Sequence, residues 1–202
     1  MKAIIIYYSQ TGNPKQIAEA ICFGASSMCE TDLVHISKIN YQTLKDYDVI
    51  GIGTPVWCER EPVNVRKLIE SMTDIEGKYS FVFCTHTILA GKFMKRIVSL
   101  LRDKKMIVIG WEDWYGGNVN PMSEKPYYTD GHPDDIDLRE AQNFGRRMIE
   151  NCIKISEGDS SLIPQLPQGK DYIERYGGSD LSSMTKGSQK EKNVSKPDIM
   201  VN

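Results

Sequence analysis

The chain has 202 residues, 40% of them hydrophobic and 26% charged, with a formal net charge of -2. This composition is typical of one globular domain with a modest extension, and the small net charge argues against nucleic acid as a general partner. No stretch reaches the roughly 20 apolar residues of a membrane helix, so we expect no membrane partner. Five cysteines without a CxxC pair are typical of free thiols, so we expect a cytoplasmic protein.

Apolar runs alternate with helical patterns along the chain. Residues 3–8 ("AIIIYY") predict a fully buried strand, because the apolar run is continuous rather than alternating. Helical spacing begins at Pro14, and we expect Gly24 to end that helix. The other predicted strands are 31–36, 49–54, 79–85 and 106–111, and the other predicted helices are 63–72, 92–101 and 135–155.

Two segments break this alternation. Residues 112–133 carry turn residues and no period, so we predict a long loop. Its aromatic residues suit either a lid beside a binding site or a small satellite core; they are Trp114, Tyr115, Tyr127 and Tyr128. Residues 158–202 are mostly polar and predict a tail or linker after a domain of residues 1–157, and the apolar residues just before Asn202 suggest that the natural chain continues.

Strands that alternate with helices predict an α/β fold, a three-layer sandwich in which helices cover both faces of a parallel sheet. Ligands bind such sheets at the carboxyl ends of the strands. Residues 9–13 ("SQTGN") lie at such an end and lead into a helix N-terminus, whose free N–H groups and partial positive charge attract anions. The segment is neither a Walker A motif nor a GxGxxG fingerprint, so a phosphate loop and a ligand-free capped turn both remain open.

Two more polar stretches follow the third and fourth predicted strands, "GTPVWCEREP" (53–62) and "CTHTILAG" (84–91). Together with the first loop they resemble the flavodoxin family, whose phosphate loop reads [ST]-x-T-G-x-T. The resemblance covers roughly residues 1–155. It implies a five-stranded parallel sheet in the order 2-1-3-4-5 and FMN as the cofactor. Residues 131–150 also resemble the last helix of flavodoxin-like domains that precede a ferredoxin module.

The resemblance implies that residues 9–15 hold the FMN phosphate and that the two later loops flank the ring. The implied cofactor-binding residues are Ser9, Gln10, Thr11, Gly12, Asn13, Pro14, Lys15, Thr54, Pro55, Val56, Trp57, Cys58, Thr85, His86, Thr87 and Gly91. Trp57 is placed to give the flat flavin ring an aromatic face, and the alternative is that it is a core or interface tryptophan. His86 lies either at the ring edge or in solvent. Cys58 is either a reactive thiol or an inert loop cysteine.

Two features depart from the family pattern. Pro14 replaces the last threonine of the phosphate motif and removes one hydroxyl and one N–H donor. Residues 55–62 contain no glycine, whereas flavodoxins often have one there that permits a peptide flip beside the flavin.

The resemblance implies a carrier that passes electrons between protein partners, possible partners being a ferredoxin or an iron–sulfur domain. The flavin would carry the chemistry, so no catalytic side chain is required. The alternatives are an FMN-dependent NAD(P)H or quinone reductase, with Arg60 as the nearest candidate for a nicotinamide phosphate, and a binding module that has lost its flavin. The three histidines are not spaced with the cysteines as metal ligands.

Overall fold

The computed structural model describes residues 1–119 and 122–166 of the chain. Its sheet has five parallel strands in the order β2-β1-β3-β4-β5, which confirms the predicted order. The strands are β1 (Lys2–Tyr7), β2 (Glu30–His35), β3 (Val49–Pro55), β4 (Tyr79–His86) and β5 (Ile107–Tyr115). The α-helices are α1 (Asn13–Ser26), α2 (Val63–Ser71), α3 (Phe93–Asp103) and α4 (Asp135–Ser156), and short 3-10 helices are η1 (Ile36–Lys38), η2 (Tyr41–Asp46) and η3 (Ser160–Leu162).

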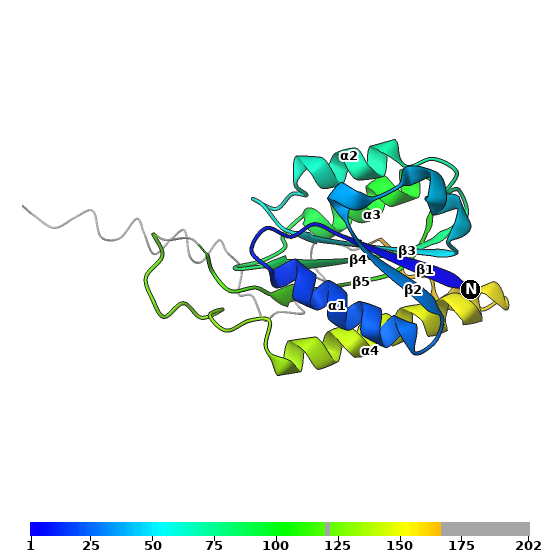
Figure 1. Ribbon diagram of the computed structural model, residues 1–202. Coiled ribbons are helices and arrows are strands. Elements are labelled where there is room, and N and C mark those ends of the chain that lie inside the picture. Colours follow the sequence, from blue (N-terminus) through cyan, green and yellow to red (C-terminus); the bar gives the residue numbers. More distant parts are fainter. Residues whose placement is uncertain (120–121, 167–202) are drawn as a thin grey trace, which may run out of the picture. The chain divides into compact units, whose positions relative to one another are not determined.

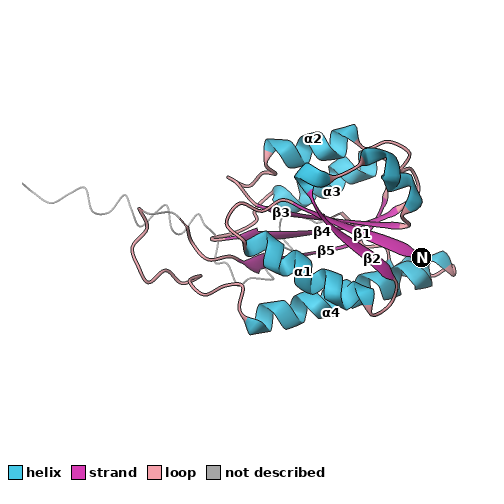
Figure 2. Cartoon of the chain, in the orientation of Figure 1, coloured by secondary structure: helices cyan, strands magenta, loops and turns pink. Residues whose placement is uncertain are grey.

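The sheet lies between two helical layers, as the sequence predicted. Figures 1 and 2 show α1 and α4 on one face and α2 and α3 on the other. Ile4, Ile5 and Ile6 are all buried, because both faces of β1 are covered. The layer with α1 and α4 contains the stacked rings of Phe81 and Phe83.

The expectation that Gly24 ends the first helix is wrong. Helix α1 continues through Gly24 to Ser26. A Cβ atom on Gly24 would collide with the backbone carbonyl of Gln142 in α4, and one on Gly145 would collide with that of Ile21 in α1. The two glycines therefore allow α1 and α4 to pack closely, and Gly24 serves this contact rather than a helix end.

The predicted boundary between the fifth strand and the following loop is also wrong. Strand β5 continues to Tyr115, and Trp114 is buried with its ring against Phe144 at 5.8 Å between centroids. The charged residues that suggested a loop have partners in the fold: Glu112 pairs with Arg147, and Asp113 bonds a side chain of β4. Trp114 is thus a core residue, not part of a lid.

The compact unit extends to Leu166. Leu162 and Ile163 pack against the core, and the Arg102 Nη2 donates to the Pro164 carbonyl at 2.7 Å. The remainder of the expected tail, including the suggested continuation beyond Asn202, lies outside the described residues. Across the described residues, none of the helices has both the length and the apolar character needed to cross a membrane. All five cysteines are free thiols.

Candidate functional site

A cavity of about 190 Å³ opens at the carboxyl edge of the sheet. Four segments form its wall, and each lies at or just after the carboxyl end of a strand, namely β1, β3, β4 or β5. The lining residues are Gln10, Thr11, Asn13, Pro14, Pro55, Val56, Trp57, Thr85, His86, Thr87, Gly116, Gly117 and Val119. All three predicted loops therefore contribute to one cavity, together with a segment after β5.

The loop after β1 presents the N-terminus of α1 to this cavity. Gly12 has a φ of 99°, in the left-handed region that favours glycine, and its N–H donates to the Ser9 hydroxyl at 3.1 Å. No side chain of the described residues caps the helix, and no acidic residue lies in its first turn. The first N–H groups and the helix dipole thus suit an anion.

The predicted residues of this loop have different positions. Gln10, Thr11, Asn13 and Pro14 line the cavity. Ser9 and Gly12 shape the loop without lining it. Lys15 lies outside the lining residues, and its Nζ is 3.5 Å from a Glu19 carboxylate oxygen on the exposed surface of the helix.

The loop after β3 forms a tight hairpin turn. Trp57 and Arg60 exchange two backbone hydrogen bonds, of 2.9 and 3.0 Å. Cys58 and Glu59 between them have φ values of 49° and 59°. This is the pattern of a type I′ turn, in which glycine or asparagine is usual. Each left-handed residue other than glycine costs roughly 1–2 kcal/mol, so the surrounding structure must hold this turn in place.

A buried carboxylate anchors the end of this turn. The Glu61 side chain is only 2% exposed and lies 2.9 Å from Arg66 Nε and 3.3 Å from Arg96 Nη2. Burial alone would raise the pKa of Glu61, but hydrogen bonds from its own backbone N–H, Arg96 and Arg66 lower that pKa overall. The ionised Glu61 therefore ties the loop to α2 and α3.

Trp57 stands at the rim of the cavity. The residue is 45% exposed, and its only ring contact among the described residues is edge-to-face with Tyr8, 5.9 Å between centroids. It is therefore not a core tryptophan. The adjacent Cys58 is exposed but does not line the cavity.

The end of β4 and the loop after it bring polar groups to the cavity. Thr85, His86 and Thr87 line it, whereas Thr54 is buried behind it with its hydroxyl donating to the Pro55 carbonyl at 2.9 Å. Gly91 lies against the Glu59 side chain and does not line the cavity.

His86 is buried, not solvated. Its Nε2 lies 2.6 Å from the Asp113 Oδ2, and its ring is edge-to-face with Tyr115 at 5.3 Å. Its Nδ1 is buried and has no hydrogen-bond partner among the described residues. The hydrogen-bonding capacity of this nitrogen is therefore unused among the described residues.

The sequence interpretation placed the loop after β5 near the site but did not identify its cavity residues, Gly116, Gly117 and Val119. The glycine pair that directly follows the strand was the available signal. Farther along this loop, the Tyr128 hydroxyl donates to the Thr87 carbonyl at 2.6 Å, and burial raises the pKa of Tyr128 to about 12.

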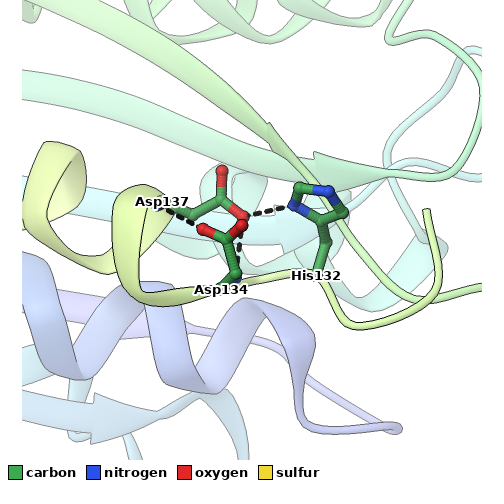
Figure 3. Close-up of side chains that lie close together, drawn as sticks. All are labelled: His132, Asp134 and Asp137. Atoms are coloured by element: carbon green, nitrogen blue, oxygen red, sulfur yellow. Dashed lines mark hydrogen bonds and ion pairs between the residues drawn. The ribbon is translucent and has the colours of Figure 1, made fainter. Parts of the chain in front are cut away.

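His132, Asp134 and Asp137 form a second polar cluster, shown in Figure 3. The Asp134 carboxylate accepts from the N–H groups of Ile136 and Asp137, and the Asp137 carboxylate accepts from the Asp134 N–H at 2.8 Å. These bonds form a capping box that begins α4. The cluster is therefore explained by the helix start.

Known proteins resemble this chain over most of its length. The family model described as a flavodoxin domain matches residues 4–111. A flavodoxin from Aquifex aeolicus is 22% identical over 176 residues, which cover 82% of this chain and 94% of that protein. An uncharacterised protein from Methanocaldococcus jannaschii is 24% identical over 165 residues, which cover 75% of this chain and 100% of that protein.

A solved flavodoxin from the domain Archaea has a TM-score of 0.60 and 23% identity, with 76% of this chain and 99% of that chain covered. Since the family model spans more than half of the 202 residues, the similarity is not confined to a short motif. The chain belongs to the flavodoxin family.

Proposed function

We propose that this protein binds FMN at the carboxyl edge of its sheet and carries electrons between protein partners. Its family and fold support a flavin-dependent redox protein. One observation carries the proposal: the uncapped N-terminus of α1 and the exposed ring of Trp57 belong to the wall of the same cavity.

The phosphate end of FMN fits the residues present. The left-handed Gly12 starts α1 without a capping side chain, so the first N–H groups are available to phosphate oxygens. Thr11 adds a hydroxyl and Asn13 an amide to the same wall. Pro14 contributes no N–H donor. Because the Lys15 ammonium is paired with Glu19, it is a weak substitute for that missing donor.

The ring end of the cavity also fits. Trp57 offers an aromatic face, and the lining residues Thr85 and Thr87 offer hydroxyls. The tight turn at Cys58–Glu59 and the Glu61 anchor hold Trp57 in place, which limits reorganisation on binding. When bound, FMN would supply the redox chemistry, and the protein would orient it and exclude water.

Exposed apolar side chains on loops that follow three of the strands suit a transient protein partner, and two of them, Trp57 and Val119, line the cavity. These exposed side chains are Trp57, Ile88, Val119, Met122 and Tyr128. Aromatic residues and methionine are enriched at protein interfaces. We therefore propose a redox protein partner such as a ferredoxin or an iron–sulfur domain. The free cysteines support a reducing compartment such as the cytoplasm.

The test is a titration of flavin-free protein with FMN and with riboflavin. We expect FMN to bind at least about tenfold more tightly, because hydrogen bonds to a charged group contribute about 1.5–3 kcal/mol. Equal affinities would contradict the phosphate site. Binding of neither ligand would favour a module that has lost its flavin.

A second test separates the carrier from the NAD(P)H or quinone reductase. The FMN-loaded protein is mixed with NADH and with NADPH in the absence of oxygen, while flavin absorbance is followed. Slow, unsaturable bleaching is the result expected of a carrier. Rapid, saturable bleaching that is lost in Arg60→Ala would instead identify a reductase, since Arg60 is exposed in the turn beside the cavity.

A further inference from the structure

A buried histidine–aspartate pair connects β4 and β5 behind the cavity. The side chains of His86 and Asp113 are 5% and 3% exposed, and Nε2 and Oδ2 are 2.6 Å apart. Asp113 is opposite Cys84 in the parallel register, so it lies on the same sheet face as His86. An ionised carboxylate only accepts hydrogen bonds, which assigns the proton of this bond to His86 Nε2.

This assignment decides which ring nitrogen of His86 can accept a proton. With Nε2–H donating to Asp113, the Nδ1 of a neutral imidazole carries a lone pair. That Nδ1 is buried without a partner among the described residues, and His86 lines the cavity. An aspartate that holds one ring nitrogen also stabilises the imidazolium that forms when the other nitrogen takes a proton.

We propose that His86, positioned by Asp113, takes up a proton at Nδ1 when electrons enter the cavity, so that reduction of this protein is coupled to an extra proton. The inference rests on the proposed function. Two electrons from a reducing protein partner bring two negative charges. Bound FMN would supply the redox chemistry and take up one solvent proton, and a second solvent proton forms an N–H bond at His86 Nδ1. The charge of the cavity is then unchanged, and both protons return to solvent on reoxidation.

The other titratable groups around His86 come from its own strand, from β5 and from the loop that follows β5. On its own strand, burial raises the pKa of Cys84, with further contributions from Asp113 and Glu112, so that thiol stays neutral. On β5, Tyr115 packs against the His86 ring. Beyond Tyr115 lie Tyr128 and His132; burial raises the pKa of Tyr128 to about 12, and His132 bonds Asp137.

His132 provides a matched control. Its Nδ1 is 2.6 Å from an oxygen of Asp137. Figure 3 draws this contact as a dashed line. His132 does not line the cavity, and its side chain is 28% exposed. The control therefore removes a histidine with an aspartate partner that lies outside the cavity, is more exposed and is bonded through Nδ1 rather than Nε2.

The experiment measures the two-electron midpoint potential of the FMN-loaded full chain as a function of pH. We expect the wild type and His132→Asn to take up one more proton per electron pair than His86→Asn, which makes their potentials steeper by about 30 mV per pH unit. In Asp113→Asn, the pH range over which the midpoint potential is steeper should shift to lower pH, because the imidazolium loses its counter-charge. Equal slopes in the wild type and His86→Asn would overturn the proposal.

A second measurement does not depend on the folding of any variant. Nitrogen NMR of ¹⁵N-histidine-labelled wild type should show His86 neutral and protonated at Nε2 in the oxidised protein, and protonated at both nitrogens after two-electron reduction. An unchanged protonation state would contradict the proposal. Failure to bind FMN would be a different result, since it would overturn the proposed function itself and this inference with it.

Discussion

The side-chain amide of Asn13 donates to the backbone carbonyl of Gly117 at 3.2 Å. This bond joins the loop after β1 to the segment after β5, although 104 residues separate them in sequence. A Cβ atom on the neighbouring Gly116 would lie only 2.7 Å from the Asn13 Nδ2, so any side chain there would displace the Asn13 amide. The positions of the loop after β1 and of the segment after β5, which both line the cavity, are therefore coupled.

Asn13→Ala should loosen this junction and weaken FMN binding. The expected loss is about 0.5–1.5 kcal/mol, the usual net contribution of one hydrogen bond, or roughly two- to tenfold in affinity. Isothermal titration calorimetry measures it. Asn143→Ala is the control, because Asn143 accepts a bond from the exposed Arg146 on α4 and should leave the affinity unchanged. Equal affinities for Asn13→Ala and the wild type would show that the junction does not support the site.

Gly12→Ala should impair FMN binding through the backbone. A Cβ atom there would meet only Gln16 Nε2 at 3.9 Å, so the cost is the left-handed φ, about 1–2 kcal/mol. FMN affinity should fall by more than riboflavin affinity, because the change reorients N–H groups near the phosphate.

Gly158→Ala is the matched control for that substitution. Gly158 has a φ of 111°, a Cβ atom added to it would meet nothing within 4 Å, and it does not line the cavity. We expect a similar loss of stability in thermal unfolding and unchanged FMN affinity. If both variants bound FMN like the wild type, the conformation of Gly12 would not matter for the site.

Trp57→Leu should brighten the fluorescence of bound flavin, since an indole stacked on the ring quenches it by electron transfer. The affinity should also fall by about 0.5–1.5 kcal/mol, the contribution of an aromatic pair beyond its buried area. Trp57→Phe should restore part of the affinity. Steady-state fluorescence of the loaded proteins measures the effect, and equally bright flavin in the wild type would argue against stacking.

Glu61→Gln should destabilise the protein by about 1.5–3 kcal/mol, because three charge-assisted hydrogen bonds from two arginines are weakened in a buried position. Glu70→Gln is the control. Glu70 is exposed and lies 3.7 Å from Arg66, so its loss should cost less than about 1 kcal/mol. Urea unfolding measures both values.

The effect of Glu61 should also depend on pH. Its folded-state pKa is lowered below the ordinary value of 4.5. The stabilisation that ionised Glu61 provides is therefore fully present above the ordinary pKa of 4.5 and is lost as the pH falls through the lower folded-state pKa. The difference in unfolding free energy between the wild type and Glu61→Gln should be constant near neutral pH and shrink in acid. A difference that grew in acid would contradict the ionised pair.

Much of the fold could be predicted from local sequence, since the continuous apolar run at residues 3–8 and the helical spacing after Pro14 each report their own surroundings. The positions of the polar loops at strand ends followed from the same alternation. The type I′ turn at Cys58–Glu59 could not be predicted from the sequence, because neither residue is one that usually occupies such a turn.

The sequence by itself determined the alternation of strands and helices, and with it the edge at which the polar loops meet, because strand and helix periods are local properties of the chain. Only the tertiary structure decided that Gly24 would continue a helix and that Asp113 would extend a strand. Gly24 depends on the close approach of Gln142 in α4, and Asp113 on its bond to His86. Such contacts join residues far apart in sequence, and packing rather than local preference selects them.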